Sequence, residues 1–574
     1  MVVSVLFFSR GEGFMSKDRF VRHANLMSGL TIVSRVAGLV RDKLWSAYLA
    51  LGTPFSSFTM GFQFPNLFRR LFGEGALTAI FVPVYTRIQK EQGQEAANRL
   101  AAATTSFLLL VLGGITLLGE LILIPIAMSS RVTPNNAFTA LMLAIMLPYC
   151  IMICLVALYS AIASVHERFT AQSISPIILN LVTAAAAVLP VMMYTAAYPI
   201  RKRVVWVAVS VIVAGVLQLL QMMPTLRRCG VRLKLSTRFK STGIGEVLKP
   251  LLPMIVGLSA VQFNVFMDGQ IAYWLSSDGH NDNNFFTLMG HVVHLPLGKG
   301  ALAKLFVAQR LYMLPVGIFG VSMATAIFPM LSKAAASNDV PEMKRLLVAG
   351  LRKTLFLSFP TSFGMIIVSR LLITLIYSGP DVSVSDIDRA AWATIWFCVG
   401  IWCFETQLVI LRVFYAMRDT KTPMKTAVAM VVLNFSLNIT LVWFMQEGGL
   451  ALATSISALV QSMVLMAILR KRLGRLGIRS LGTTVGLSLL ATLVMVEVGL
   501  LIRGIHLPWD AAPALSPVGM RAKILTALVK LPLIVAASAG VYLGITWFFG
   551  MPELADLPLL GRYLKRASAD RASN

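Results

Sequence analysis

The chain has 574 residues, of which 57% are hydrophobic and only 13% charged, and its mean hydropathy is +0.76. Soluble domains are usually about 45–50% apolar and about 25% charged, so this composition excludes a water-soluble globular protein. The formal net charge is +26, but the sequence has no basic polar domain of the kind that binds nucleic acid. Such an excess of Lys and Arg is expected in the cytoplasmic loops of a membrane protein. The five cysteines show no CxxC spacing, so we predict neither a disulfide nor a metal site.

Apolar stretches recur along the whole chain. A helix needs about 20 mostly apolar residues to cross a bilayer. Fourteen windows meet this length: 27–50, 56–86, 101–129, 136–164, 174–196, 204–225, 250–276, 301–332, 347–378, 391–416, 424–445, 449–469, 483–503 and 525–549. They predict an all-α polytopic membrane protein with about 14 transmembrane helices.

The charges between these windows predict the orientation. With the N-terminus inside, the inner segments hold roughly 30 Lys and Arg and the outer segments roughly 9, the bias expected of cytoplasmic loops. The basic loop 227–248 lies on the inner side, and the cluster Arg201 to Arg203 on the outer side runs against the bias. We therefore predict that the N-terminus and the C-terminus are both cytoplasmic.

The two halves of the chain repeat short sequences at an offset of about 250 residues. Residues 78–83 read TAIFVP and residues 325–329 read TAIFP, while ILN at 178–180 is answered by VLN at 432–434. Paired repeats that rock around a midplane site are the usual build of a secondary transporter.

The repeat predicts two pseudo-repeated six-helix bundles followed by an extra C-terminal helix pair. The predicted parts are a cytoplasmic N-terminal segment (1–25), an N-terminal bundle (26–226), a basic cytoplasmic loop (227–248), a C-terminal bundle (249–470), the extra helix pair (471–549) and a cytoplasmic tail (550–574).

The first span contains four charged residues: Arg35, Arg41, Asp42 and Lys43. Each costs about 2.5–3.5 kcal/mol at the centre of a membrane helix, so together they cannot face lipid. They must line protein or a water-filled cavity. Arg35 and Asp42 are seven residues apart and share one helix face, whereas Arg41 points about 120° away.

Other spans carry charges that differ in their sequence partners. Arg70 and Glu74 stand at i,i+4 and can form a pair. Arg412 lies seven residues after Glu405, which favours mutual neutralisation. Arg310, in contrast, has no acid nearby in its span.

Arg35, Arg69 and Arg310 are therefore cations without an evident internal partner. Guanidinium groups bind phosphate oxygens two at a time, so these residues suggest a cavity for a multiply charged anion such as a diphosphate. The alternative is a stabilising network in which acids from other helices neutralise the arginines: Asp42, Glu74, Asp268 and Glu405.

Several of these segments resemble one family. The stretches are SGLTIVSRVAGLVRD at 28–42, FPNLFRRLFGEGA at 64–76, AQRL at 308–311 and FYAMRDTKTP at 414–423. Arg168, Pro176 and Asn180 continue the pattern. Over about residues 25–480 the chain resembles the MurJ/MviN family, the lipid II flippases of the MOP exporter superfamily.

The resemblance implies a transporter and not an enzyme. Such a flippase moves lipid II, the undecaprenyl-diphosphate-linked disaccharide-pentapeptide, from the inner to the outer leaflet of the bacterial cytoplasmic membrane for peptidoglycan synthesis. It works by alternating access, driven by membrane potential or a coupling ion of unknown identity, with no cofactor. Membrane lipid and the cell-wall synthesis machinery are the other implied partners, and nucleic acid is not one.

The resemblance also implies residue roles. The family's cavity arginines fall on Arg35, Arg41, Arg69 and Arg310, and the extra helix pair forms a groove for the lipid tail. The residues predicted to act in gating or coupling are Asp42, Arg70, Glu74, Asn180, Asn264, Asp268, Asp419 and Lys421.

The chain departs from the family at Ser56, Gln309 and Met313, where acids are expected, and its outer loop 277–300 is longer than usual. The missing acids make the predicted cavity more positive and weaken any carboxylate-based coupling. The alternative is another MOP exporter, either a polysaccharide-lipid flippase or a drug or ion antiporter. A cationic-drug antiporter should have acids in its cavity, which is the opposite balance.

Overall fold

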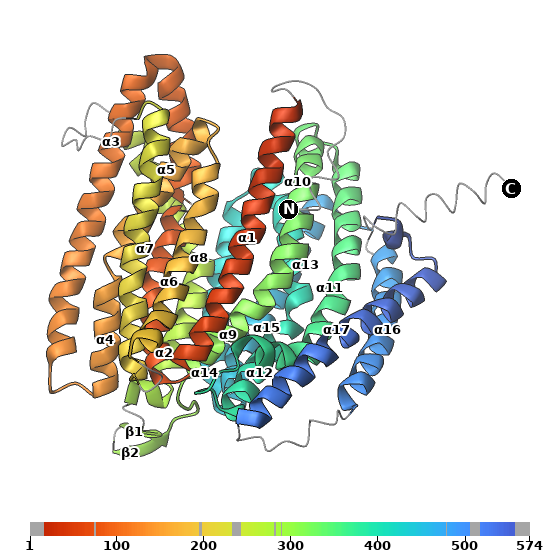
Figure 1. Cartoon of the computed structure of the whole chain (residues 1–574). Helices are drawn as coiled ribbons and strands as arrows, with labels where there is room; N and C mark the ends of the chain where they lie inside the picture. Colours follow the sequence, from red (N-terminus) through yellow and green to blue (C-terminus); the bar gives the residue numbers. More distant parts are fainter. Residues whose placement is uncertain are drawn as a thin grey trace. The chain divides into compact units, whose positions relative to one another are not determined.

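The structure is a computed structural model that describes residues 17–73, 76–194, 198–231, 243–280, 283–288, 290–477, 479–505 and 517–556. Most of these residues are helical (Figure 1). The helices up to the long outer loop are α1 (Lys17–Leu49), α2 (Thr53–Phe68), η2 (Arg69–Gly73), α3 (Ala76–Met128), α4 (Pro134–Met146), α5 (Tyr149–Val165), α6 (Thr170–Tyr194), α7 (Ile200–Arg228) and α8 (Ile244–Trp274).

The helices after that loop are α9 (Ala301–Pro315), η4 (Val316–Gly320), α10 (Val321–Ala336), α11 (Val340–Tyr377), α12 (Val384–Val399), α13 (Ile401–Ala416), α14 (Lys421–Met445), α15 (Glu447–Leu473), α16 (Arg479–Gly504), α17 (Pro517–Phe548) and η5 (Pro552–Asp556). Within the described residues, all fourteen predicted windows therefore coincide with helical segments, and the all-α polytopic class is confirmed.

In the described part of the chain, ten helices are long and apolar enough to cross a membrane, and the bent pair α12 and α13 would be an eleventh. The three other predicted spans fall on α1, on α2 with the start of α3, and on α8. α2 has 16 residues, fewer than a spanning helix needs. α3 is two helices that meet at Gly93, whose backbone (φ 85°, ψ 174°) favours glycine and separates the predicted second and third spans.

Packing divides the chain into two units. The first unit comprises Met15–Ala303 together with Gly379–Val382, and the second comprises Lys304–Ser378 and Ser383–Asn574. In the first unit α8 packs against α2 and α3, although the repeat assigns α8 to the C-terminal bundle. The packing units and the predicted bundles are thus different partitions of the chain, and the bundles stay a prediction.

The repeat has a counterpart in two π-helices. η2 follows Pro65 in the second predicted span, and η4 follows Pro315 in the eighth, about 250 residues later, the offset of the sequence repeat. A proline within a helix removes one backbone hydrogen bond and crowds the preceding turn. A local change to π geometry beside each proline accommodates this defect, and such segments are frequent at functional sites.

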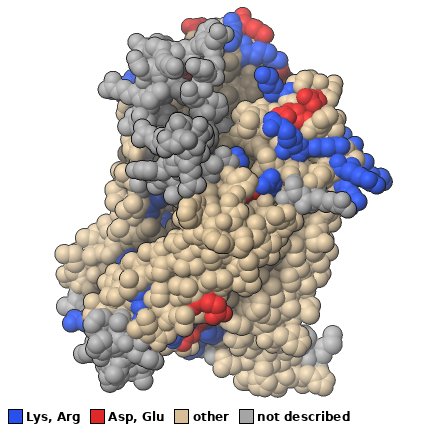
Figure 2. Space-filling view, turned by 90° about the vertical axis from the view of Figure 1, so that its right-hand side faces the viewer, with Lys and Arg blue, Asp and Glu red and all other residues tan. Residues whose placement is uncertain are grey.

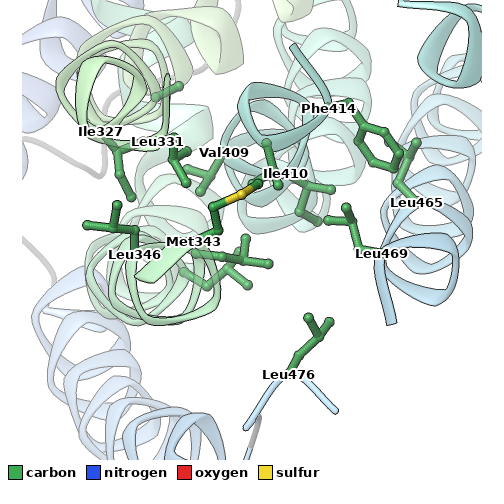
Figure 3. Close-up of a cluster of buried hydrophobic side chains, with 14 of the residues drawn as sticks. Ile327, Leu331, Met343, Leu346, Val409, Ile410, Phe414, Leu465, Leu469 and Leu476 are labelled. Carbon is green, nitrogen blue, oxygen red and sulfur yellow. The ribbon is translucent and has the colours of Figure 1, made fainter. Parts of the chain in front are cut away.

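A buried apolar cluster holds part of the second unit together (Figure 3). Ile327 and Leu331 of α10 pack with side chains of α11, α13 and α15. The helices around it begin at clear signals: the Asp339 side chain accepts the amide of Glu342 at the start of α11, and Ser383 and Asp386 form a capping box at the start of α12. Local caps therefore fix where these helices begin, and apolar packing joins them.

The loop 277–300 contains structure that the sequence did not predict. A short 3₁₀ helix, η3 (Ser277–His280), precedes the antiparallel strands β1 (Phe285–Leu288) and β2 (His291–His294), in which Phe285 faces His294. Asp278, predicted to lie in a polar outer loop, is buried: it accepts hydrogen bonds from the Thr53 hydroxyl at 2.7 Å and from the Gly300 amide at 3.0 Å. The loop is thus fastened to the start of α2.

In the second unit, α16 and α17 pack against each other and against α11 (Figure 1). Both helices present many large apolar side chains outward, among them Leu493, Leu501, Leu533 and Trp547. The face in Figure 2 is mostly uncharged, and its Lys and Arg gather mainly toward one end. An apolar band of this kind suits contact with lipid tails.

Candidate functional site

Two arginines of α1, Arg35 and Arg41, have opposite environments. The Arg35 side chain is exposed and forms no hydrogen bond or ion pair within the described residues. Arg41, only six residues later, is 4% exposed. Less than two turns of helix therefore separate an exposed cation from a buried one.

Arg41 is neutralised within the first unit. Its Nη2 lies 2.6 Å from Oδ1 of Asp42, and its Nη1 donates to Oδ1 of Asn180 in α6 at 2.7 Å. The guanidinium carbon lies 4.5 Å from the centre of the Trp45 ring, which adds a cation–π contact. Asn180 in turn donates to the backbone carbonyl of Ser34 at 3.0 Å, so α6 clasps α1. Asn180, predicted to act in gating, thus contacts one of the predicted cavity arginines.

At the end of α2, two arginines of the π-helix η2 have amide partners. Arg69 is half-buried, and its Nη2 donates to Oδ1 of Asn66 at 3.0 Å, so it has an amide partner that the sequence did not suggest. Arg70 donates to Oε1 of Gln262 in α8 at 2.7 Å. Glu74, the predicted partner of Arg70, lies outside the described residues.

Arg310 of α9 lies in the second unit and is exposed. Its guanidinium carbon lies 4.9 Å from the centre of the Phe306 ring, and no carboxylate within the described residues pairs with it. Gln309 is half-buried and Met313 is 36% exposed, so no acid replaces the two that the family pattern would place there. The cation expected from the sequence is therefore present without a neutralising partner.

The predicted neutralisation of Arg412 by Glu405 is wrong. Glu405 is 0% exposed, and neither carboxylate oxygen has a hydrogen-bond partner within the described residues. Arg412 instead lies over the ring of Phe328, with 5.3 Å between the guanidinium carbon and the ring centre. Seven residues span about 10.5 Å along a helix, so a shared face does not bring the two groups together.

The remaining predicted gating residues have separate positions. In α8, Asp268 is 1% exposed and Asn264 is half-buried. Asp419 precedes α14, where its carboxylate accepts the Thr422 amide at 3.0 Å and the Arg472 guanidinium at 2.5 Å. Burial opposes ionisation of Asp419, but the Thr422 and Arg472 hydrogen bonds outweigh it and lower its pKa to about 2. Lys421 in the next turn is exposed.

Ser56 keeps part of the role that an acid would have. It is fully buried, and its hydroxyl accepts the backbone amide of Ala303 in the first turn of α9 at 3.3 Å. Asp278, which accepts the Gly300 amide, supplies a carboxylate at the same helix start. The sequence missed Asp278 because its partners are more than twenty residues away along the chain.

Among the described residues of the second unit are buried or half-buried ion pairs that were also not predicted from the sequence. They are Lys304–Asp386 at 2.8 Å, Arg389–Glu447 at 2.6 Å and Arg352–Glu553 at 2.8 Å. Lys304 within an apolar window was the available signal, since a buried ammonium requires a counter-charge. The contrary basic cluster of the first unit is also tied down: Arg203 donates to the carbonyls of Tyr198 and Tyr48 at 2.7 and 3.1 Å.

Comparison with known proteins agrees with this architecture. A family model described as "Lipid II flippase MurJ" matches residues 45–516. The lipid II flippase MurJ of Burkholderia cenocepacia is 28% identical over 455 residues, which cover 78% of this chain and 83% of that protein. A probable lipid II flippase MurJ of Rhizobium tropici is 28% identical over 557 residues, which cover 96% and 97% of the two chains.

Solved structures share the fold. A structure of lipid II flippase MurJ in an inward closed conformation aligns with a TM-score of 0.67 and 21% identity over 89% of this chain and 98% of that one. An inward-facing MATE multidrug resistance transporter of the MOP superfamily aligns with a TM-score of 0.61 and 13% identity over 80% and 99%. Because the family model covers most of the chain, the protein is a multi-pass membrane protein of the lipid II flippase MurJ family.

Proposed function

We propose that this chain moves lipid II from the inner to the outer leaflet of the bacterial cytoplasmic membrane by alternating access. The observation that carries the proposal is the family match over residues 45–516, to which the relatives named lipid II flippase add support. Exposed arginines within the spanning helices of both units are consistent with an anionic cargo.

The cargo chemistry follows from the arginines. Arg35 and Arg310 are exposed cations without an ion-pair partner in the described part of the chain, and Arg69 has a neutral amide partner. A diphosphate offers the charge and the paired oxygens that guanidinium groups bind best. Arg41 also belongs to the predicted substrate-binding set, and its release from Asp42 would have to accompany binding. The extra helices α16 and α17 would then accommodate the lipid tail.

The remaining features of the proposal follow from charge. Both termini would be cytoplasmic, and the transporter would need no cofactor. A cytoplasm-negative potential favours outward movement of an anion by about 2.3 kcal/mol per charge per 100 mV if the charge crosses the full field. Asp42, Arg70, Glu74, Asn180, Asn264, Asp268, Asp419 and Lys421 stay the predicted gating or coupling residues.

Depletion and complementation test this function. In cells that depend on this protein, depletion should cause lipid II to accumulate on the inner leaflet. Arg35→Ala and Arg310→Ala should each abolish rescue while the protein still reaches the membrane in normal amounts. Arg345→Ala is the matched control, because Arg345 is an exposed arginine paired with Glu342 on the same helix, and it should rescue fully.

Full rescue by both cavity variants would refute the binding role of these arginines. Absence of lipid II accumulation on depletion would refute the flippase itself. Accumulation of a different lipid-linked saccharide would favour the alternative exporter of polysaccharide-lipids.

A further inference from the structure

Glu405 differs from the other buried glutamates of the second unit. Glu447 and Glu553 are 0% and 5% exposed, and each lies within 2.8 Å of an arginine nitrogen. Glu405 is equally buried, but neither of its carboxylate oxygens has a hydrogen-bond partner among the described residues. An ionised carboxylate in such a place would carry a large desolvation cost with nothing to offset it.

The side chain of Glu405 packs against the π-helix η4 at Gly320. A Cβ atom added at Gly320 would lie 2.9 Å from Cγ of Glu405 and 3.2 Å from Leu408, so the two helices meet here only because residue 320 lacks a side chain. The ring of Tyr312 packs in a tilted arrangement against Phe404, which is next to Glu405 in sequence, with 5.2 Å between the ring centres. The surroundings of the carboxyl group are therefore apolar and closely packed.

Several charged groups lie on the elements that neighbour Glu405. Arg412 of α13 lies over Phe328, Arg352 of α11 pairs with Glu553, and Arg389 of α12 pairs with Glu447 of α15. Lys333 lies in the last turn of α10, and Arg470 to Arg472 lie in the last turn of α15, whereas η4 has no titratable residue. Within the described residues none of these groups hydrogen-bonds to Glu405.

The first unit has the same arrangement without the carboxyl group. There α5 packs against η2 as α13 packs against η4. Counted from the residue before each helix, Pro148 and Gly400, the position of Glu405 corresponds to Ile153, which is buried. An apolar side chain therefore suffices for this packing, and the carboxyl group of Glu405 has no structural role that Ile153 lacks.

We infer that Glu405 is a proton-binding site, which holds its proton while η4 packs against α13 and releases it to water when they separate. The proton leaves the carboxylic acid and the carboxylate remains, so no other reactant is needed. A metal cation would require several oxygen ligands, and no second polar group of the described residues meets Glu405. If the chain is the proposed flippase, release and uptake here would couple cargo movement to a proton gradient.

Infrared spectroscopy of the purified full-length protein tests the site without any lipid II. At neutral pH the wild type should show the C=O stretch of a protonated carboxylic acid that Glu405→Gln lacks. Glu447→Gln is the matched control, because Glu447 is equally buried but paired with an arginine, and it should leave that band unchanged. Identical acid bands in wild type and Glu405→Gln would overturn the proposal.

A second variant leaves Glu405 in place. Gly320→Ala adds the Cβ that meets Glu405, so it should separate η4 from α13 and cause the band to disappear at a lower pH than in the wild type. An unchanged titration in Gly320→Ala would contradict release on separation. If the wild-type protein shows the infrared band but does not translocate lipid II, the proposed function is refuted and the proton-binding site is not.

Discussion

The Arg41 cluster of the first unit and the Glu405 pocket of the second place ionisable groups in apolar helices in opposite ways. Arg41 has an acid beside it, an amide from α6 and an aromatic ring below it. Glu405 lies against Gly320, and neither of its carboxylate oxygens has a hydrogen-bond partner among the described residues. The first arrangement fixes a charge in place, whereas the second permits no fixed charge.

The difference shows what decides whether a charge in a membrane helix is neutralised. Residues three or four apart are neighbours on a helix, and residues seven apart are not in contact. Glu405 and Arg412 therefore share a face without pairing. Arg41 and Asp42 are adjacent, yet the long arginine side chain turns back to reach Asp42, and Asn180 of a second helix completes the site. The neighbouring helix, more than the sequence spacing, sets the outcome.

The most damaging change should be Asp42→Ala. It leaves the buried Arg41 cation without its counter-charge, and removing one partner of a buried ion pair costs about 3–5 kcal/mol. Chemical unfolding of the purified protein in detergent should show this loss in the free energy of unfolding.

The control is Asp388→Ala, which breaks the exposed pair with Arg370 at 2.6 Å. Exposed pairs contribute at most about 1 kcal/mol, so this variant should be close to the wild type. Equal losses in the two variants would mean that Arg41 is solvated, and the contrast between the two regions would disappear.

Asn180→Ala should have an intermediate effect. It removes the acceptor for Arg41 and the donor to Ser34, and a buried polar group that loses its hydrogen bond costs about 1–3 kcal/mol. The same unfolding measurement applies. Asn98→Ala also removes two side-chain hydrogen bonds, one to the Gly230 carbonyl and one from Gln94, but Asn98 is not buried, so the variant should change the free energy of unfolding less. A larger loss in Asn98→Ala than in Asn180→Ala would show that Asn180 of α6 does not stabilise the buried Arg41.

Most of the fold was predictable from the sequence because each membrane-spanning helix requires a long apolar stretch, which is visible in the hydropathy. All fourteen windows fall on helices in the part of the chain that the structure describes, and the offset of the repeat reappears in η2 and η4. The hairpin of β1 and β2 was not predicted, since short strands in a polar loop leave no apolar period. The break at Gly93 inside α3 was predicted only as a gap between two windows.

The site was predictable in residue type but not in pairing. Charges at Arg35 and Arg310 are visible in the sequence, and both are exposed in the structure. One hydrogen-bond partner of Arg70 is Gln262 in α8, almost two hundred residues away, and no local spacing points to it. The predicted i,i+4 pair of Arg70 and Glu74 stays a prediction, because Glu74 lies outside the described residues.

Arg412→Ala should cost little. Its contact with Phe328 is a cation–π interaction, worth about 0.5–1 kcal/mol at a partly exposed site. The free energy of unfolding should therefore fall by no more than that amount. A loss as large as that of Asp42→Ala would show that Arg412 neutralises Glu405 after all, and it would make the two regions alike.

The smallest effect on stability should come from protonation of Asp419 at acid pH. This carboxylate lies in a loop and is hydrogen-bonded to Thr422 and Arg472. Its pKa of about 2 lies below the ordinary value of about 3.9. A carboxylate with a lowered pKa stabilises the fold above its unfolded-state value, and this contribution is lost as pH falls from about 4 toward 2. The wild type should thus lose stability over that range more steeply than Asp419→Asn. Arg472→Ala should move the loss to higher pH, because it removes one of the groups that lower the pKa. An identical acid slope in all three proteins would show that Asp419 is solvated, unlike the paired carboxylate of Asp42.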